Sequence, residues 1–195
     1  MQLTTIFVDT EGAYAEEIAA IAVNSSTLQI IDVFHEFAKP QAVDDWSRKH
    51  VHGLNCNWLQ NNAKFNNQTE LMQAFRQWLR GRNVLAIFAN DPSKERMLFG
   101  QDLAVNDLCF PMWSQREARP SHLITFLFKR AFIPVLNKRC CAEAHSSFKY
   151  VPVYRNSTSE LARRRFGFHC SLYDCLECYL FFIEERALPL TTIKQ

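Results

Sequence analysis

Three strand-like runs joined by short turns fill residues 4 to 38 and constrain the fold more than any other feature. The runs read TTIFVDTE, EEIAAIAVN and LQIIDVFHEFA, with the turn-forming segments EGAY and NSST between them. Connections this short join antiparallel neighbours, because a parallel pair needs a crossover of about a dozen residues or more. The sequence therefore predicts an antiparallel meander at the start of the domain.

The rest of the chain is predicted to be mainly helical, with one further strand. Apolar periodicity predicts a buried strand at 83–91 and helices at 43–54, 67–81, 92–103, 122–132 and 170–186. The weak pattern between Pro134 and Ser157 is interpreted as a loop. This order of elements predicts a single domain over residues 1–195. Its class is α/β, with a mixed sheet whose first three strands are antiparallel and whose faces are flanked by helices.

The composition is that of a globular intracellular protein. Hydrophobic residues make up 48% of the chain, and the formal net charge is only +2, so a polyanionic partner would have to meet a local basic patch. The seven cysteines are scattered, apart from adjacent Cys140 and Cys141, which favours reduced thiols over a disulfide framework. The segment MQLTTIFVDTEG lacks signal-peptide features, and no apolar run is long enough to span a membrane. We expect a location in the cytoplasm or nucleus.

Two acidic side chains lie at the end of the first predicted strand. Side chains alternate across a strand, so Asp9 and Glu11 share one face with Phe7. Their side chains would lie roughly 6 to 7 Å apart and would repel each other unless a cation, a hydrogen-bond donor or water compensates them. A solvated strand end is the simple interpretation, and a cation site is the functional one.

Two more acids and a histidine lie at the ends of later elements. Asp91 ends a predicted strand just before Pro92 opens a helix, and an N-cap role would explain it. Asp174 lies in the otherwise apolar last helix and follows His169 at the predicted start of that helix. A hydrogen-bonded structural pair would explain these two. No single structural role explains all of these acids together, so we expect them to meet at one edge of the sheet.

Four short motifs, taken in order, resemble those of a known enzyme family. The segments FVDTEG, HVHGLN, FAND and HCSLYD are similar to the first exonuclease motif, the His-Gly segment, the second motif and the His-x4-Asp third motif of the DnaQ-like DEDDh 3′–5′ exonucleases. The resemblance spans residues 6 to 174 and implies a ribonuclease H-like fold. It also implies an exonuclease whose metal-binding catalytic acids are Asp9, Glu11, Asp91 and Asp174 and whose general base is His169.

The same resemblance implies how cofactors and substrate bind. The acids would hold two Mg²⁺ or Mn²⁺ ions, since hard oxygen ligands suit these cations. His52 and Leu54 would lie near the 3′-terminal nucleotide of single-stranded RNA or DNA, with Leu54 packing against a base.

Basic and aromatic residues offer further substrate contacts. Arg165 closes a run of three arginines shortly before His169 and would contact phosphates, or else belong to a solvated helical face. Tyr14, Trp46 and Trp58 would stack on unpaired bases, or else lie in the core.

The second motif departs from the family pattern. The family has Asn-x-x-x-Asp, whereas here Asp91 directly follows Asn90 and Lys94 stands at the position of the acid. Glu95 is the substitute candidate for that acid. As the next residue of a helix that starts at Pro92, Glu95 is expected to be an exposed charge.

The HCSLYD segment also resembles the Maelstrom domain, a branch of the same family. Cys141, His145 and Cys170 are similar to three ligands of the zinc site of that domain, which implies a possible Zn²⁺ and favours RNA as the substrate. Free thiols are the simpler interpretation, because a closed structural zinc site needs four ligands. The alternative function is therefore a Maelstrom-like RNA-binding module with weak or no nuclease activity, stabilised by zinc.

Overall fold

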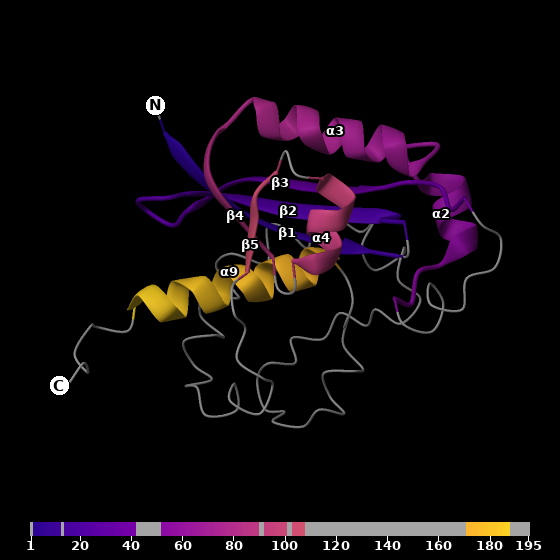
Figure 1. Ribbon diagram of the computed structural model, residues 1–195. Helices are drawn as coiled ribbons and strands as arrows, with labels where there is room; N and C mark the ends of the chain where they lie inside the picture. The colour runs from indigo at the N-terminus through magenta and orange to yellow at the C-terminus, as the bar shows by residue number, and fades with distance from the viewer. Residues whose placement is uncertain are drawn as a thin grey trace, which may run out of the picture.

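A five-stranded mixed sheet forms the centre of the protein (Figure 1). The computed structural model describes residues 2–12, 14–41, 52–89, 92–100, 103–107 and 171–187. The strand order is β3-β2-β1-β4-β5, and the bounds are β1 Leu3–Glu11, β2 Glu17–Asn24, β3 Ile30–Phe37, β4 Asn83–Ala89 and β5 Val105–Asp107.

The strand directions confirm the predicted meander. β1 pairs antiparallel with β2, and β2 pairs antiparallel with β3, whereas β4 runs parallel to both β1 and β5. The predicted class, an α/β protein with a mixed sheet whose first three strands are antiparallel, is therefore confirmed. β1 is the central strand of the described sheet. β2 pairs with it as far as Glu11, whereas its described pairing with β4 ends at Phe7.

Helices cover both faces of the sheet. Their bounds are α2 Cys56–Asn62, α3 Gln68–Arg80, α4 Ser93–Phe99 and α9 Ser171–Ala187. Figure 1 shows α3 on one face and α9 on the other. None of the helices that the structure describes combines the length and the apolar character needed to cross a membrane.

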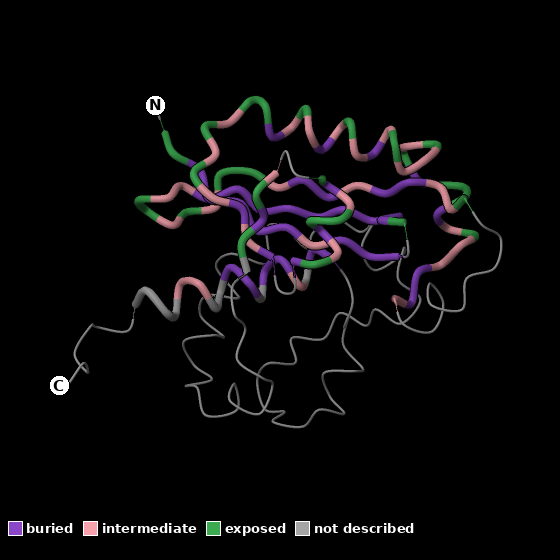
Figure 2. The backbone as a smooth tube through the Cα atoms, in the orientation of Figure 1, coloured by how far each residue is buried: buried purple, intermediate pink, exposed green. Residues whose placement is uncertain are grey.

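Alternation along β1 divides the core into two layers. Ile6 and Val8 pack with Phe75 of α3, whereas Phe7 faces the opposite layer and packs with Leu172 and Leu176 of α9. All six side chains are buried, and the central strands are buried along most of their length (Figure 2). The two layers explain why β1 and β2 are apolar on both faces, as strands covered from both sides must be.

Local sequence accounts for the long helix α3. The side chain of Asn67 accepts a hydrogen bond from the backbone N–H of Glu70 at 3.0 Å, which caps the first turn, and the helix stops at Gly81. Its buried residues, Leu71, Phe75 and Leu79, follow helical spacing. The helix predicted at 67–81 is confirmed.

Other predicted elements differ from the structure or lie outside the described residues. The helix predicted at 43–54 is wrong at its end: residues 52–54 are not helical, and Gly53 has a φ of 62°, which a right-handed helix does not allow. The rest of that segment, the helix at 122–132 and the loop between Pro134 and Ser157 lie outside the described residues. The short elements α2 and β5 were not predicted.

Candidate active site

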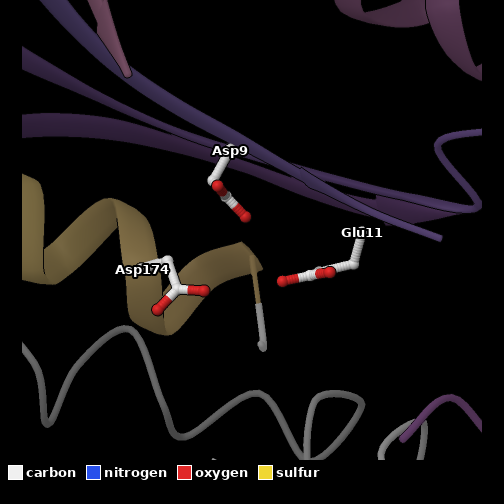
Figure 3. Close-up of side chains that lie close together, drawn as sticks. All are labelled: Asp9, Glu11 and Asp174. Carbon is white, nitrogen blue, oxygen red and sulfur yellow. The ribbon is translucent and has the colours of Figure 1, made fainter. Parts of the chain in front are cut away.

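The carboxylates of Asp9, Glu11 and Asp174 lie together, as Figure 3 shows. One oxygen from each can be chosen so that all three lie within 4.8 Å of one another. Asp9 and Glu11 come from the end of β1, and Asp174 comes from the first turn of α9. The predicted convergence of these three acids is therefore found in the structure.

Packing of α9 on the sheet brings the distant acid to the strand. Cys175 is buried, and its thiol donates a hydrogen bond to the backbone oxygen of Ala19 in β2 at 3.2 Å. Further along α9, the ring of Tyr179 packs edge-on against Phe7. Asp174, next to Cys175 in the chain, is thus held beside the end of β1.

The cluster is electrostatically strained in the absence of a cation. Burial raises the pKa of Asp9 well above its ordinary value, and the charges of Asp174, Glu11 and Glu95 raise it further, while Lys94 opposes them. Asp9 Oδ2 is buried, and no hydrogen-bond donor among the described residues reaches it. A buried carboxylate oxygen that lacks a donor is an available ligand for a metal ion.

The donor set fits a hard divalent cation. All three groups are carboxylates, the ligands that Mg²⁺ and Mn²⁺ prefer. Two ligand atoms on opposite sides of one Mg²⁺ lie about 4.2 Å apart. The three carboxylate oxygens, all within 4.8 Å of one another, are therefore near the spacing of ligands around one such cation.

His52 lies next to the cluster. Its Nδ1 contacts Oε2 of Glu11, and both side chains are largely buried. A carboxylate can accept a hydrogen bond from an imidazole and bind a cation at the same time, and such a partner orients the ligand. His52 thus adjoins the acids, although its predicted contact with a nucleotide stays a prediction.

Leu54 is buried and packs with Phe37 and Leu59 in a small cluster beside α2. Trp58 packs against the same cluster, with its ring edge-on to Phe37. Packing of Leu54 against a terminal base stays a prediction.

Glu95 corrects one expectation. Its residue is only 3% exposed, whereas the sequence predicted a solvated charge. Its Oε1 accepts a hydrogen bond from Thr10 Oγ1 at 2.8 Å, and burial raises its pKa. Because Thr10 points to the opposite face of β1 from Asp9 and Glu11, Glu95 lies behind the acid cluster. Sequence reasoning could not find this contact, since the two residues belong to different elements.

The remaining predicted site residues lie outside the described residues. They are Asp91 and His169 of the exonuclease motifs, Arg165 of the arginine run, and the zinc candidates Cys141, His145 and Cys170. Their roles stay predictions.

Cys175 belongs to the described part of α9. Burial raises the pKa of its thiol well above the ordinary value, and the charges of nearby carboxylates raise it further. A protonated thiol agrees with the hydrogen bond that Cys175 donates to Ala19.

No family model and no curated protein matches the chain. Among solved structures, the zinc-ion-bound form of the E. coli ExoI complex with single-stranded DNA is similar over 96% of this chain and 41% of its own, with 12% identity and a TM-score of 0.54. E. coli exonuclease I in complex with a 5cy-dT13 oligonucleotide is similar over 96% of this chain and 42% of its own, with 13% identity and a TM-score of 0.54. This chain spans less than half the length of either neighbour. At this low identity the likeness concerns the fold alone, and the protein has the ribonuclease H-like mixed sheet of the exonuclease I structures.

Proposed function

We propose that the protein is a metal-dependent 3′–5′ exonuclease that acts on single-stranded nucleic acid. The observation that carries the proposal is the convergence of Asp9, Glu11 and Asp174, together with the buried Asp9 oxygen that lacks a hydrogen-bond donor. The fold supports it, because the similar E. coli exonuclease I structures contain single-stranded DNA.

The acids would act as the metal-binding groups. Bound Mg²⁺ or Mn²⁺, two ions in the proposed arrangement, supplies activation of the attacking water and compensation for charge on the leaving 3′-oxygen. Asp9, Glu11 and Asp174, which lie together at the end of the central strand, would hold the cations. Asp91 is the proposed fourth acid, because Glu95 lies behind the cluster and is hydrogen-bonded to Thr10.

His169 is the proposed general base. It precedes Asp174 by five residues in the sequence. A histidine has an unperturbed pKa of about 6.5, so its neutral form accepts a proton from the attacking water near pH 7. Its removal is expected to slow hydrolysis about 10²- to 10⁴-fold while leaving the acids in place.

Three residues are proposed to contact the substrate. His52 adjoins Glu11 and would contact the terminal nucleotide, with Leu54 beside it. Arg165 would bind backbone phosphates, because a guanidinium pairs well with phosphate oxygens. RNA is proposed as the preferred substrate on the strength of the Maelstrom resemblance.

A labelled-oligonucleotide assay tests the proposal. Purified protein with Mg²⁺ or Mn²⁺ should shorten a 5′-labelled single strand stepwise, and matched RNA and DNA strands measure the preference between them. The double variant Asp9→Asn, Glu11→Gln should abolish shortening, because it removes two ligand charges without changing side-chain volume. Glu36→Gln is the matched control, since Glu36 pairs with Lys64 on the surface of β3.

Two results would overturn the proposal. One is full activity in the double variant, which would point to a contaminating nuclease. The other is stoichiometric zinc that survives dialysis together with RNA binding and no hydrolysis, which would establish the alternative RNA-binding module.

A further inference from the structure

Two consecutive residues of α4 hold the end of β1 from behind the acid cluster. Lys94 Nζ donates a hydrogen bond to the backbone oxygen of Thr10 at 2.8 Å. Glu95 Oε1 accepts one from the hydroxyl of Thr10, also at 2.8 Å. Thr10 stands between Asp9 and Glu11, so both contacts act on the residue that joins two of the clustered acids. We call Thr10, Lys94 and Glu95 the Thr10 clamp.

The clamp contacts the part of β1 that lies beyond its described pairing with β4. Pairing of β1 with β4 runs from Leu3 to Phe7, and its last described pair is Phe7 with Phe88. On the other side, β2 accompanies β1 as far as Glu11. Among the described residues, the contacts of α4 with Thr10 therefore take the place of a neighbouring strand at the end that carries the acids.

A buried carboxylate is a costly group to use if the only role of the clamp is to hold the fold together. Glu95 is nearly fully buried, and burying a carboxylate is costly unless partners compensate it. A well-packed apolar side chain would hold α4 against β1 without this cost. A cost of this kind is expected where the geometry of a site is under constraint.

We propose that Lys94 and Glu95 are positioning residues that fix Asp9 and Glu11 in the geometry needed to bind a divalent cation. The inference rests on the proposed metal site and adds residues that act on it through Thr10. A site of this kind must be held within about 0.5 Å of its working geometry. Loss of groups that orient metal ligands typically weakens metal binding about 10- to 100-fold.

Lys94→Met separates positioning from charge. If Lys94 acted only through its charge, its removal would tighten cation binding, because a positive neighbour repels the metal. The clamp predicts the opposite, a weakening of about tenfold. Lys94→Arg should restore most of the affinity, since its side chain keeps a cationic donor. Lys64→Met, a surface lysine paired with Glu36, is the matched control and should bind as the wild type does.

Thr10→Val tests the clamp without any change of charge. The substitution removes the hydroxyl that donates a hydrogen bond to Glu95. Cation binding should weaken about tenfold, and Thr10→Ser should bind as the wild type does. Thr5→Val is the matched control, because Thr5 is also a buried threonine of β1 and its hydroxyl bonds to Ser25 at 2.9 Å. Both valine variants should lose similar stability, and only Thr10→Val should lose metal affinity.

The measurement is the dissociation constant for Mn²⁺ alone, obtained by electron paramagnetic resonance at one fixed pH on variants shown to be folded by circular dichroism. Unchanged affinity in Lys94→Met and Thr10→Val, with wild-type binding intact, would overturn the clamp and leave the proposed function standing. Affinity lost in Glu95→Gln as completely as in Asp9→Asn would make Glu95 a ligand, and would also overturn the positioning role. A wild type that binds no Mn²⁺ would overturn the proposed function and the clamp together.

Discussion

The ring of Tyr179 in α9 lies edge-on to the ring of Phe7 in β1, with centroids 5.8 Å apart and planes at 66°. Phe7 also contacts Phe182, with centroids 5.2 Å apart, and both contacts join α9 to the strand two residues before Asp9. Edge-on aromatic pairs stabilise a fold beyond the area they bury. This packing is what sets Asp174 beside Asp9, so the core and the acid cluster depend on the same rings.

Replacement of Phe7 by Ala should therefore destabilise the protein severely. Phe7 is fully buried, and truncating a buried phenylalanine costs about 3 to 5 kcal/mol of unfolding free energy. Urea denaturation measures the change. Leu3→Ala on the same strand is the control: Leu3 is 43% exposed, and its replacement should cost less than about 0.5 kcal/mol. Equal losses in the two variants would show that α9 does not pack on Phe7.

Asp9→Asn should change stability and activity in opposite directions. The substitution removes a buried charge that Asp174 and Glu11 repel, so the metal-free protein should gain about 0.5 to 2 kcal/mol, as is common when an active-site group is replaced. Hydrolysis should fall below detection because the substitution removes a proposed metal ligand. Thermal denaturation in EDTA and the labelled-strand assay measure the two effects. A less stable variant would mean that the Asp9 carboxylate is compensated in the fold.

The stability of the metal-free protein should fall as pH rises above mild acidity. The folded-state pKa values of Asp9 and Glu95 are raised above their ordinary values of 3.8 and 4.5, both chiefly by burial. Between those values and the raised ones, the folded protein binds more protons than the unfolded chain, so the unfolding free energy decreases with increasing pH. The double variant Asp9→Asn, Glu95→Gln should lose this slope. Urea midpoints in EDTA from about pH 5 to 8 measure it, and parallel curves for variant and wild type would contradict it.

Gly12→Ala should destabilise the turn that follows the acids. Gly12 has a φ of +85°, and an added Cβ would lie 1.7 Å from Oε2 of the buried Glu16. Backbone strain alone costs about 1 to 3 kcal/mol. Gly81→Ala is the control, since its φ is −74° and the nearest atom to an added Cβ is 3.9 Å away. Its urea midpoint should stay close to that of the wild type, and a similar shift in both variants would refute the special role of Gly12.

Tyr14→Ala should weaken substrate binding. Tyr14 is 52% exposed and follows Glu11 by three residues, which suits a ring that stacks on a base near the cluster. Stacking of one base on an aromatic ring contributes about 1 to 3 kcal/mol, so KM should rise about fivefold or more with little change in kcat. Tyr14→Phe should behave as the wild type. Met97→Ala, at a residue 74% exposed on α4, controls for loss of surface apolar area. An unchanged KM in Tyr14→Ala would rule out the stacking role.

The regular elements could be predicted because their patterns are local. Alternation in β1 predicts that Asp9 and Glu11 share a face with Phe7, and the structure confirms that Phe7 packs against α9 while Ile6 and Val8 face α3. The elements that were missed are short: α2 has seven residues and β5 has three, too few to show a period.

The site could be predicted only in part, because some of its contacts have no local signal. Asp174 was identifiable as a carboxylate in an apolar helix. The burial of Glu95 was not, since it depends on Thr10, which precedes it by more than eighty residues and meets it only through the packing of α4 on β1. Tertiary contacts of this kind override the expectation that a charged residue in a short helix is solvated.

The three acids become available at different times during synthesis of the chain, because they come from its first strand and its last described helix. The last of the described strands ends at Asp107, but Asp174 belongs to α9, much later in the chain. At about 5 to 20 residues per second, a ribosome delivers Asp174 roughly 3 to 13 s after the last strand. During that interval the nascent chain carries only part of its cation-binding group. The three-carboxylate cluster therefore cannot form on the ribosome until α9 has been made and has docked on the sheet.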